Sequence, residues 1–268
     1  MDLQLKGRRA LVTGSSSGIG EAIVRLLTEE GAQVVVHGRN RERAERVAAD
    51  IGAAGVAIGE LSEDGAAEAV HGEAVAALGG NIEILINNAG GNSEGNTSKK
   101  PADISVADFM SNYRANTLGA VALCQLCVPA MVEARFGRIV NVSSAVAMQP
   151  NFMGADYSAA KAALLNYTVS LAGSLRGENV CPNVLTPGVI LVEGLVRFGR
   201  MKFGDDSLTA DQVNERLAAE AVFEVPPAGR FGLPHELAMV AAMLASPANG
   251  FITGANYRVD GGQTRGLN

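Results

Sequence analysis

The sequence predicts an α/β protein in which a parallel sheet is covered by helices on both faces. Short apolar runs rich in valine and isoleucine alternate with longer segments of helical pattern. Apolar strands separated by helix-length crossovers are typical of parallel sheets buried on both sides. The 268 residues, 47% of them hydrophobic, are enough to bury a large core. No internal repeat or linker is visible, so residues 1–268 are predicted to form a single domain.

The strands and helices can be placed in order along the chain. The predicted strands are Arg9 to Val12, Val34 to Val36, Val56 to Ile58, Ile84 to Ile86, Arg138 to Val142, Val180 to Leu185 and Asn256 to Val259. The predicted helices are Gly20 to Glu30, Arg41 to Ile51, Gly65 to Leu78 and a segment that begins at about Ser105. Each of the first four strands is therefore followed by a helix, which is the pattern of a parallel crossover.

The overall charge excludes some classes of partner. The net charge is −6 and the isoelectric point is about 5.2, which argues against nucleic acid or an anionic membrane. No apolar run approaches the roughly 18 residues of a membrane span. Residues 1–9 lead directly into a strand and lack the apolar core of a signal peptide. We therefore expect a cytoplasmic protein with no membrane partner.

The three cysteines are too few for a disulfide framework. Cys124 and Cys127 form a CxxC pair, which raises the alternative of redox chemistry. They lie in the apolar helical stretch AVALCQLCVPAM, with no strand before the pair. Free cysteine packs as a small hydrophobic side chain, so a buried packing role is favoured. No metal site is predicted.

Two stretches are not explained by the sheet. Residues 91–103 are polar and turn-rich, and residues 191–227 form a long insertion with a helix predicted from Asp211 to Ala221. Long insertions in compact α/β domains are often lids or binding loops, and ligands gather at the carboxyl ends of parallel strands. The segment at about 191–227 is therefore predicted to be a substrate lid, with a surface loop without function as the alternative.

The first strand runs into the turn Thr13-Gly-Ser-Ser-Ser-Gly-Ile-Gly20, which a helix follows. Glycines let backbone N–H groups approach a pyrophosphate, and the helix N-terminus adds partial positive charge. Glycine spacing alone is weak evidence, but its place between the first strand and a helix favours a dinucleotide site.

The end of the second strand indicates which nicotinamide cofactor is used. An NAD site usually has an acidic residue here for the ribose 2′-hydroxyl, whereas an arginine suits the 2′-phosphate of NADP. Residues 37–40 contain no acid, and Arg39 follows the strand. NADP(H) is therefore favoured, with NAD(H) as the alternative. Arg41 and Arg43 are weaker candidates for the phosphate contact.

A second group of residues indicates proton-transfer chemistry. Tyr157 and Lys161 are four residues apart in a strong helix former, so both side chains share one helix face. Ser144 lies at the end of a predicted strand, where it can meet that helix. A free phenol has a pKa of about 10, and an ammonium roughly 4 Å away is expected to lower it. That shift would make Tyr157 an effective general acid and base.

Taken together and in order, these motifs resemble the short-chain dehydrogenase/reductase family, and the chain is similar to bacterial members of the 3-oxoacyl-carrier-protein reductase type. The resemblance covers essentially the whole chain. Its motifs are TGSSSGIG at 13–20, NNAG at 87–90, Asn116 in RANTLGA, Ser144, YSAAK at 157–161, PG at 187–188 and ITGANYRVDGG at 252–262.

The resemblance implies a Rossmann-type doubly wound sheet of seven strands in the order 3-2-1-4-5-6-7. It also implies hydride transfer between a nicotinamide and a small carbonyl or alcohol substrate. Tyr157 would be the general acid in reduction and the general base in oxidation. Lys161 would bind the nicotinamide ribose and lower the tyrosine pKa, Ser144 would hydrogen-bond the substrate oxygen, and Asn116 would hold a water in a proton relay.

The same resemblance implies the cofactor contacts. Asn87 would stabilise the central strand near the cofactor ribose, Pro187 and Gly188 would shape the nicotinamide pocket, and the Ile190 backbone would meet the carboxamide. The implied cofactor-binding residues are Gly14, Ser16, Ser17, Gly18, Ile19, Gly20, Arg39, Glu60, Leu61, Asn87, Ala89, Gly90, Tyr157, Lys161, Pro187, Gly188 and Ile190. Helices around 105–133 and 157–175 would build a homotetramer core, with a homodimer as the alternative, and the C-terminal VDGG segment would form another interface.

Three residues depart from the family pattern. Glu60 stands where an aspartate is usual for the adenine amino group, and Val192 replaces a threonine that contacts the nicotinamide amide. Pro182 interrupts a segment that is usually a continuous strand and removes a ladder donor. The departures concern cofactor geometry and leave the proton-transfer residues intact.

Two alternatives to an oxidoreductase remain. One is an epimerase or dehydratase of a related fold, which usually has a longer chain and a different glycine spacing. The other is a catalytically silent cofactor-binding regulatory protein, which loss of Tyr157 or Lys161 would have indicated.

For the substrate, one hypothesis is a medium-sized or bulky ketone in an apolar pocket; the alternative is that the same side chains pack the lid. They are Phe152, Met153, Leu195, Phe198, Met201, Phe203 and Phe223. Acyl-carrier-protein thioesters are a further substrate class, although the chain's acidity gives no support for docking an acidic carrier.

Overall fold

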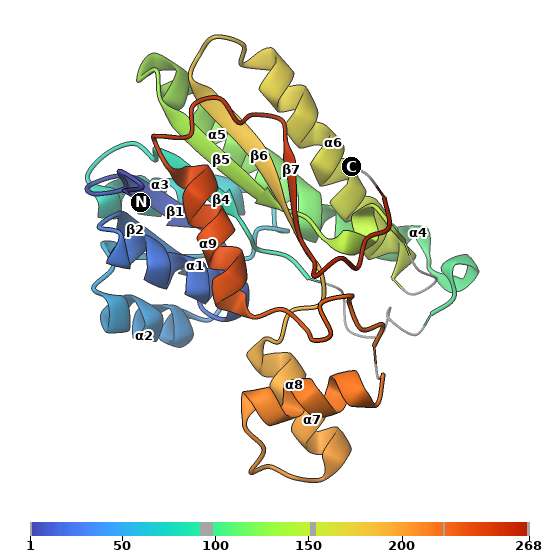
Figure 1. Cartoon of the computed structure of the whole chain (residues 1–268). Helices are drawn as coiled ribbons and strands as arrows, with labels where there is room; N and C mark the ends of the chain where they lie inside the picture. Colours follow the sequence, from blue (N-terminus) through green and yellow to red (C-terminus); the bar gives the residue numbers. More distant parts are fainter. Residues whose placement is uncertain (1, 92–98, 151–153, 222, 267–268) are drawn as a thin grey trace.

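A single seven-stranded parallel sheet runs through the centre of the computed structural model, which describes residues 2–91, 99–150, 154–221 and 223–266. Its strand order is β3-β2-β1-β4-β5-β6-β7 (Figure 1), so the expected Rossmann-type order is confirmed. The strands are β1 (Arg9–Val12), β2 (Gln33–Gly38), β3 (Gly55–Ile58), β4 (Ile84–Asn87), β5 (Gly137–Val142), β6 (Val180–Pro187) and β7 (Asn256–Val259).

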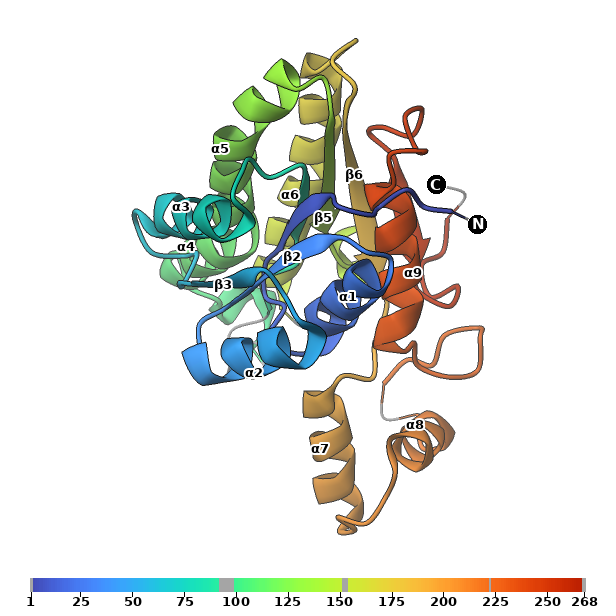
Figure 2. The ribbon, with the colours of Figure 1, turned by 90° about the vertical axis from the view of Figure 1, so that its left-hand side faces the viewer.

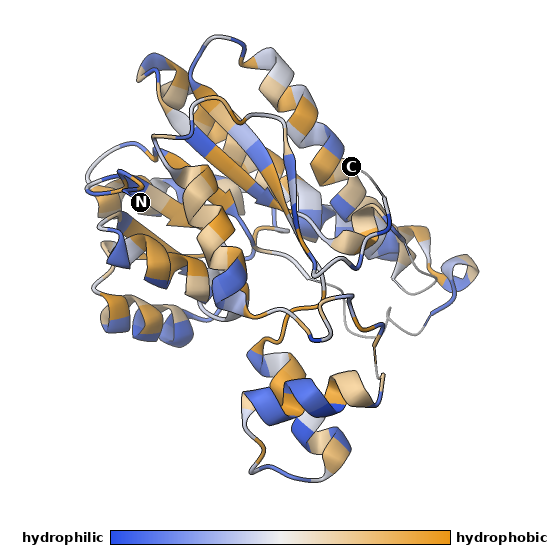
Figure 3. Ribbon diagram, in the orientation of Figure 1, coloured by the Kyte–Doolittle hydropathy of each residue, from blue (hydrophilic) through white to orange (hydrophobic). Residues whose placement is uncertain are grey.

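Helices cover both faces of the sheet, as Figure 2 shows. On one face lie α1 (Gly18–Glu29), α2 (Arg41–Ile51) and α9 (Pro234–Ala245), and on the other lie α3 (Ala66–Leu78), α5 (Gly119–Glu133) and α6 (Ala155–Ser174). Each set packs its apolar side chains onto the sheet as one cluster. The hydropathy colouring in Figure 3 shows this division, with apolar strands at the centre and polar residues along the outer side of α2.

The helix expected from about Ser105 is divided. It consists of α4 (Val106–Tyr113), a π-helical turn η3 (Arg114–Leu118) and α5. The stretch Val106–Glu133 has the length and hydropathy of a membrane span, by those two measures alone. In this fold its α5 part packs on the sheet through Leu123 and Met131, which are almost completely buried. A π-turn is often found at functional sites.

The segment predicted to be a lid contains two helices, α7 (Glu193–Phe203) and α8 (Ala210–Ala219), which project from the body in Figure 1. The predicted helix at 211–221 is therefore confirmed, with slightly earlier ends. These helices have an apolar cluster of their own, which includes Leu195, Phe198, Phe203 and Phe223. Met201 is 72% exposed. Phe152 and Met153 lie outside the described residues, as do residues 92–98 of the polar loop.

The expectation that Pro182 interrupts its strand is wrong. Strand β6 continues through this residue, which pairs with Ile139 of β5. The Pro182 carbonyl accepts a hydrogen bond from Gly254, so residue 182 faces the loop before β7 and not β5. In a parallel strand the N–H and C=O of one residue point to the same side. The N–H that proline lacks would therefore point toward the loop before β7, and its absence costs no hydrogen bond to β5.

The CxxC pair has the packing role that the sequence favours. Cys124 and Cys127 are free thiols on α5 and are at most 1% exposed. Burial raises the pKa of Cys124 to about 12 and raises the pKa of Cys127 as well. Reactive cysteines have the opposite shift, so this pair belongs to the core.

Candidate active site

Two adjoining cavities lie at the carboxyl ends of the strands, each with a volume of about 410 Å³. They share five lining residues from the loops after β1 and β4 and therefore form one elongated groove. The shared residues are Gly14, Ser17, Asn88, Gly90 and Gly91. This edge of an open α/β sheet is where ligands bind.

The glycines of the first turn are required by close backbone approach. Gly14 has a φ of +64°, and a Cβ there would lie 2.9 Å from the Ala89 Cα. A Cβ at Gly20 would collide with the Gly14 carbonyl oxygen. Gly18 also has positive φ (+61°) and is the first residue of α1, whose N-terminus opens into the groove next to Ser17. The turn therefore provides a backbone cradle with the partial positive charge of a helix N-terminus, as a phosphate requires.

Two side chains hold this turn in place. The Gly14 N–H donates to Nδ1 of His37 at 2.9 Å, and the Asn88 amide donates to the carbonyls of Thr13 and Gly14 at 2.9 and 3.1 Å. His37 is 2% exposed, and burial lowers its pKa to about 4. The neutral imidazole can accept from Gly14, whereas the imidazolium cannot.

One end of the groove is lined by Ser16, Arg39, Glu60 and Leu61. Arg39 follows β2 and is 78% exposed at its side chain, and its guanidinium pairs with the Glu60 carboxylate at 2.9 Å. Burial acts to raise the pKa of Glu60, but hydrogen bonds from Arg39 and Ser62 outweigh it, so the net shift is downward. An exposed pair of this kind is weak, so Arg39 can exchange Glu60 for a phosphate at little cost.

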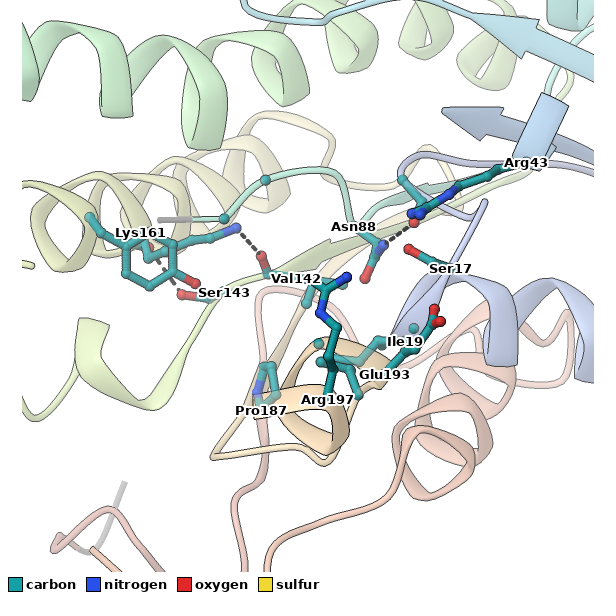
Figure 4. A pocket seen from close by; sticks show the side chains of 17 residues that line it. Ser17, Ile19, Arg43, Asn88, Val142, Ser143, Lys161, Pro187, Glu193 and Arg197 are labelled. Carbon is teal, nitrogen blue, oxygen red and sulfur yellow. Dashed lines mark hydrogen bonds between the residues drawn. The ribbon is translucent and has the colours of Figure 1, made fainter. Parts of the chain in front are cut away.

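At the other end of the groove, Tyr157 and Lys161 of α6 line the wall beside Val142 and Ser143. The Lys161 ammonium donates to the Val142 carbonyl at 2.9 Å and lies 5.9 Å from the centre of the Tyr157 ring. Ser143 donates to the Lys161 carbonyl at 3.0 Å, which ties α6 to the end of β5 (Figure 4). Ser144 follows, and its side chain hydrogen-bonds Tyr157.

The pKa expected for Tyr157 is wrong for this arrangement. Burial raises the pKa of the Tyr157 phenol, and the hydrogen bond with Ser144 only partly opposes it. The ammonium of Lys161 donates to a backbone carbonyl and lies 5.9 Å from the centre of the Tyr157 ring, and the Tyr157 shift is set by burial and Ser144. Burial also lowers the pKa of Lys161 to about 8. The desolvation of both groups therefore outweighs the attraction that the helical spacing suggested.

Asn116 lies in the π-turn η3 and is 2% exposed. Its amide group contacts both backbone groups of Gly91, since Oδ1 accepts from the N–H and Nδ2 donates to the carbonyl, each at 2.9 Å. Thr117, the next residue, donates to the Ala160 carbonyl at 2.7 Å and so fixes the turn against α6. Asn116 is thus close to Lys161 but is engaged with the chain after β4.

Several predicted residues do not line the groove. Asn87 is buried between strands, where its amide donates to Asn141 at 2.8 Å. Ile190 forms a bridge with Gly232 and turns its side chain into the core. Gly188 packs closely against Asp260. Asn116 and Gly20 are buried behind the lining residues. Ser144 is half-buried and hydrogen-bonds the lining residue Tyr157, and Pro187 and Val192 line the groove.

The groove also contains two residues that the sequence did not single out, Glu193 and Arg197 of α7. Arg43 of α2, a weaker candidate for the phosphate contact, lines it as well. Figure 4 shows the Arg197 side chain extending between Lys161 on one side and Ser17 on the other. Asn88 stands in the NNAG motif, so the signal for it was present. For Arg197 there was none, because the sequence does not say which way helix α7 faces.

The fold and this groove define a nucleotide-dependent oxidoreductase of the doubly wound type. The sequence profile of the short chain dehydrogenases matches residues 8–200. A 3-oxoacyl-[acyl-carrier-protein] reductase of Aquifex aeolicus is 34% identical over 98% of this chain and 99% of its own. The L-sorbose reductase from Gluconobacter frateurii, complexed with NADPH and L-sorbose, is 29% identical with a TM-score of 0.87, covering both chains completely. A 3-oxoacyl (acyl-carrier-protein) reductase from Agrobacterium tumefaciens with NADP bound is 30% identical with a TM-score of 0.85, over 97% of this chain and 96% of that one.

The chain therefore belongs to the short chain dehydrogenase/reductase family. It is an oxidoreductase that acts on CH–OH or C=O groups with NAD(P).

Proposed function

We propose that this protein is an NADP(H)-dependent reductase that interconverts a small carbonyl compound and its secondary alcohol, with Tyr157 as the general acid and base. The observation that carries the proposal is that Tyr157, hydrogen-bonded to Ser144, and Lys161 line one end of a groove whose other end holds Arg39 and the glycine turn. One ligand can then span both groups.

NADP(H) fits this groove better than NAD(H). The glycine turn leaves room for a pyrophosphate at the N-terminus of α1. Arg39 supplies a cation where NAD sites have an acid, although Glu60 now occupies it. Solved relatives with NADPH and NADP bound support the same assignment. Arg43 lines the groove and adds a second positive charge.

When bound, the nicotinamide donates or accepts the hydride. In reduction Tyr157 donates its hydroxyl proton to the substrate oxygen, and in oxidation it removes that proton from the alcohol. A raised phenol pKa keeps Tyr157 protonated at neutral pH, which suits the reductive direction. Ser144 orients the phenol and hydrogen-bonds the substrate oxygen as charge develops on it. Lys161 supplies positive charge beside the phenol, and Asn116 holds the chain after β4.

The lid at about 191–227 is proposed to cover the substrate, within a single domain formed by the whole chain. The described apolar lid residues support the packing alternative over the apolar-pocket hypothesis, because Leu195, Phe198, Phe203 and Phe223 contact one another or their own cluster. Substrate preference is then set by other groups at the groove, and the solved relatives, which act on L-sorbose or 3-oxoacyl thioesters, name two chemical classes to test.

We also propose a cytoplasmic homo-oligomer, of which a tetramer is the favoured form. Large apolar side chains are exposed along α4, the π-turn and α6, and they are Val106, Phe109, Met110, Tyr113, Leu118 and Val169. Exposed apolar patches of this kind mark protein–protein interfaces.

A carbonyl panel tests the proposed function. Purified protein is mixed with NADPH or NADH and with L-sorbose, a 3-oxoacyl thioester, an apolar ketone or a small keto acid, and the loss of nicotinamide absorbance is followed. We expect turnover of at least one carbonyl, faster with NADPH. Binding of NADPH without turnover of any member would favour the silent regulatory alternative, and conversion of a member without net loss of NADPH would favour an epimerase.

A further inference from the structure

A row of buried polar side chains connects the first turn of α6 to the wall of the groove. Asp156, the residue before Tyr157, is 1% exposed, and Asn112 of α4 is completely buried. Nδ2 of Asn112 donates to the Asp156 carboxylate. Oδ1 of Asn112 lies 3.3 Å from Nδ2 of Asn116, and Oδ1 of Asn116 accepts from the Gly91 N–H at 2.9 Å. The row thus ends at a residue that lines both cavities.

The donors and acceptors in this row determine which way each amide group faces. A carboxylate only accepts hydrogen bonds, so Asn112 must turn its NH₂ group toward Asp156. This leaves Oδ1 of Asn112 facing the NH₂ group of Asn116. The two hydrogens of that group serve the Gly91 backbone carbonyl at 2.9 Å and, on the other side, the backbone carbonyl and Oδ1 of Asn112 at 3.1 and 3.3 Å. If either amide turned over, two donors or two acceptors would face each other in a buried site, at a cost of about 1–3 kcal/mol per lost partner. The acid therefore fixes the orientation of the Asn112 amide, whose Oδ1 adds to the backbone contacts that orient Asn116.

The far end of the row shapes the space beside Lys161. Gly90 and Gly91 have φ of +146° and +153°, a conformation that only glycine adopts readily. A Cβ on Gly90 would lie 2.5 Å from Oδ1 of Asn116 and 3.1 Å from Nζ of Lys161. Gly90 therefore stands against both the amide and the ammonium, and the space between them has no room for a side chain. A turn of Asn116 would shift this wall and change the surroundings of Lys161.

Packing alone gives no reason for an acid at this position. Burying a carboxylate and an amide costs free energy that apolar side chains of the same size would not. The first turn of a helix favours a negative side chain, which offsets part of that cost at Asp156. The structure keeps the polar pair at the contact between α4 and α6, directly beside Tyr157 and one turn before Asn116.

We propose that Asp156 and Asn112 are positioning residues that hold Asn116 and the Gly90–Gly91 backbone in place for proton transfer at Tyr157. The inference rests on the proposed function, which places Tyr157 and Lys161 at the reacting end. Neither Asp156 nor Asn112 lines either cavity. They act through Asn116.

An exchange of the two residues separates their chemistry from their shape. Asn112→Asp places a second carboxylate against Asp156. The double variant Asn112→Asp/Asp156→Asn restores one acid and one amide, and its new acid still accepts from Asn116. We expect Asn112→Asp to lower kcat about tenfold or more and to raise the solvent deuterium isotope effect on NADPH-dependent reduction, with the Kd for NADPH changed less than about twofold. The exchanged variant should recover most of kcat and the wild-type isotope effect.

Hydrogen exchange at Gly91 gives a readout that does not depend on turnover. Its N–H is held by Asn116, so exchange at this amide should accelerate in Asn112→Asp and return toward the wild-type rate in the exchanged variant. If Asn112→Asp does not fold, Asp156→Asn is the milder test, since it keeps the shape and removes only the charge. It should accelerate Gly91 exchange to a smaller extent.

Asn183 provides the matched control. This amide is also completely buried, and it clamps the chain after α9 through the Ile252 carbonyl and the Ala255 N–H. Asn183→Asp should lower stability without altering Gly91 exchange or the isotope effect. Wild-type Gly91 exchange and isotope effect in Asn112→Asp, or no recovery in the exchanged variant, would overturn the inference. Absence of any carbonyl turnover by the wild-type protein would instead remove the proposed function, and Gly91 exchange would still decide the positioning role.

Discussion

At the scale of single residues, His37 links the stability of the fold to the cofactor turn. Its Nδ1 accepts from Gly14, the first glycine of the turn, and the imidazole is almost fully buried. Burial lowers the pKa of His37 from its ordinary 6.5 to about 4. The unfolded chain therefore binds a proton at a higher pH than the folded one, so stability falls as the pH drops from 6.5 to 4.

This linkage predicts a pH-dependent stability that a variant removes. Above pH 6.5 His37 is neutral in both the folded and the unfolded chain, so its contribution to the free energy of unfolding is fully present. By pH 4 the wild-type protein should lose on the order of 3 kcal/mol of unfolding free energy through this group. In His37→Asn an amide oxygen can still accept from Gly14 but does not titrate. Urea unfolding measured from pH 7 to 4 should show a steeper loss for wild type; parallel curves would contradict the assignment.

Arg39 carries the predicted cofactor preference. Arg39→Asp removes the cation and also leaves the Glu60 carboxylate without its partner at the groove. Two acids would then face the 2′-phosphate, so the ratio of kcat/KM for NADPH over NADH should fall at least about tenfold, equivalent to roughly 1.4 kcal/mol. Steady-state kinetics with both cofactors measure the ratio. An unchanged ratio would mean that the phosphate contact lies elsewhere.

At the scale of elements, helix α7 contributes more to the groove than the sequence indicated. Arg197 extends from it into the cavity that the turn at Ser17 also lines. Arg197→Gln should raise the Kd for NADPH about fivefold, because one charge-assisted contact to an anionic ligand is lost. Fluorescence titration with NADPH measures the change. Lys202→Gln on the same helix is the control, since Lys202 pairs with Glu220 and does not line the groove. Equal affinities for both variants would remove Arg197 from the site.

Elements whose pattern is local could be predicted, whereas those set by tertiary contacts could not. Strand β1 and helix α2 have the ends expected from their apolar runs and their neighbouring turns. Helix α9 was missed because its apolar residues are nearly continuous and lack helical periodicity. The π-turn at Asn116 was also missed, since it depends on packing against α6.

The same division holds within the site. The glycine turn, Arg39, Tyr157 and Lys161 could be found from motifs that lie close together in sequence. The Asp156–Asn112 contact joins residues 44 positions apart and has no sequence signal. The pKa of Tyr157 was misjudged because helical spacing gives the distance of Lys161 but not its hydrogen-bond partner, the Val142 carbonyl.

At the scale of the whole molecule, the apolar surface over α4 and α6 predicts self-association. Val169 is 51% exposed on α6, the helix against which α4 packs. Val169→Arg should reduce the assembly to a smaller form by placing a charge in a desolvated interface. Light scattering after size-exclusion chromatography measures the mass. Met201→Arg, a change at a residue that is 72% exposed on the lid, should leave the assembly intact. A monomeric wild-type protein would contradict the proposed oligomer.

The proposed reaction of the whole molecule depends on a proton passing between the Tyr157 hydroxyl and the substrate oxygen. The most direct measurement is single-turnover oxidation of bound NADPH by the best carbonyl of the panel, in wild type and in Tyr157→Phe. Loss of the hydroxyl should slow the step by about 100- to 10,000-fold, the range for general acid–base catalysis, while NADPH affinity stays near wild type. A Tyr157→Phe rate within about twofold of wild type would contradict the proposed chemistry.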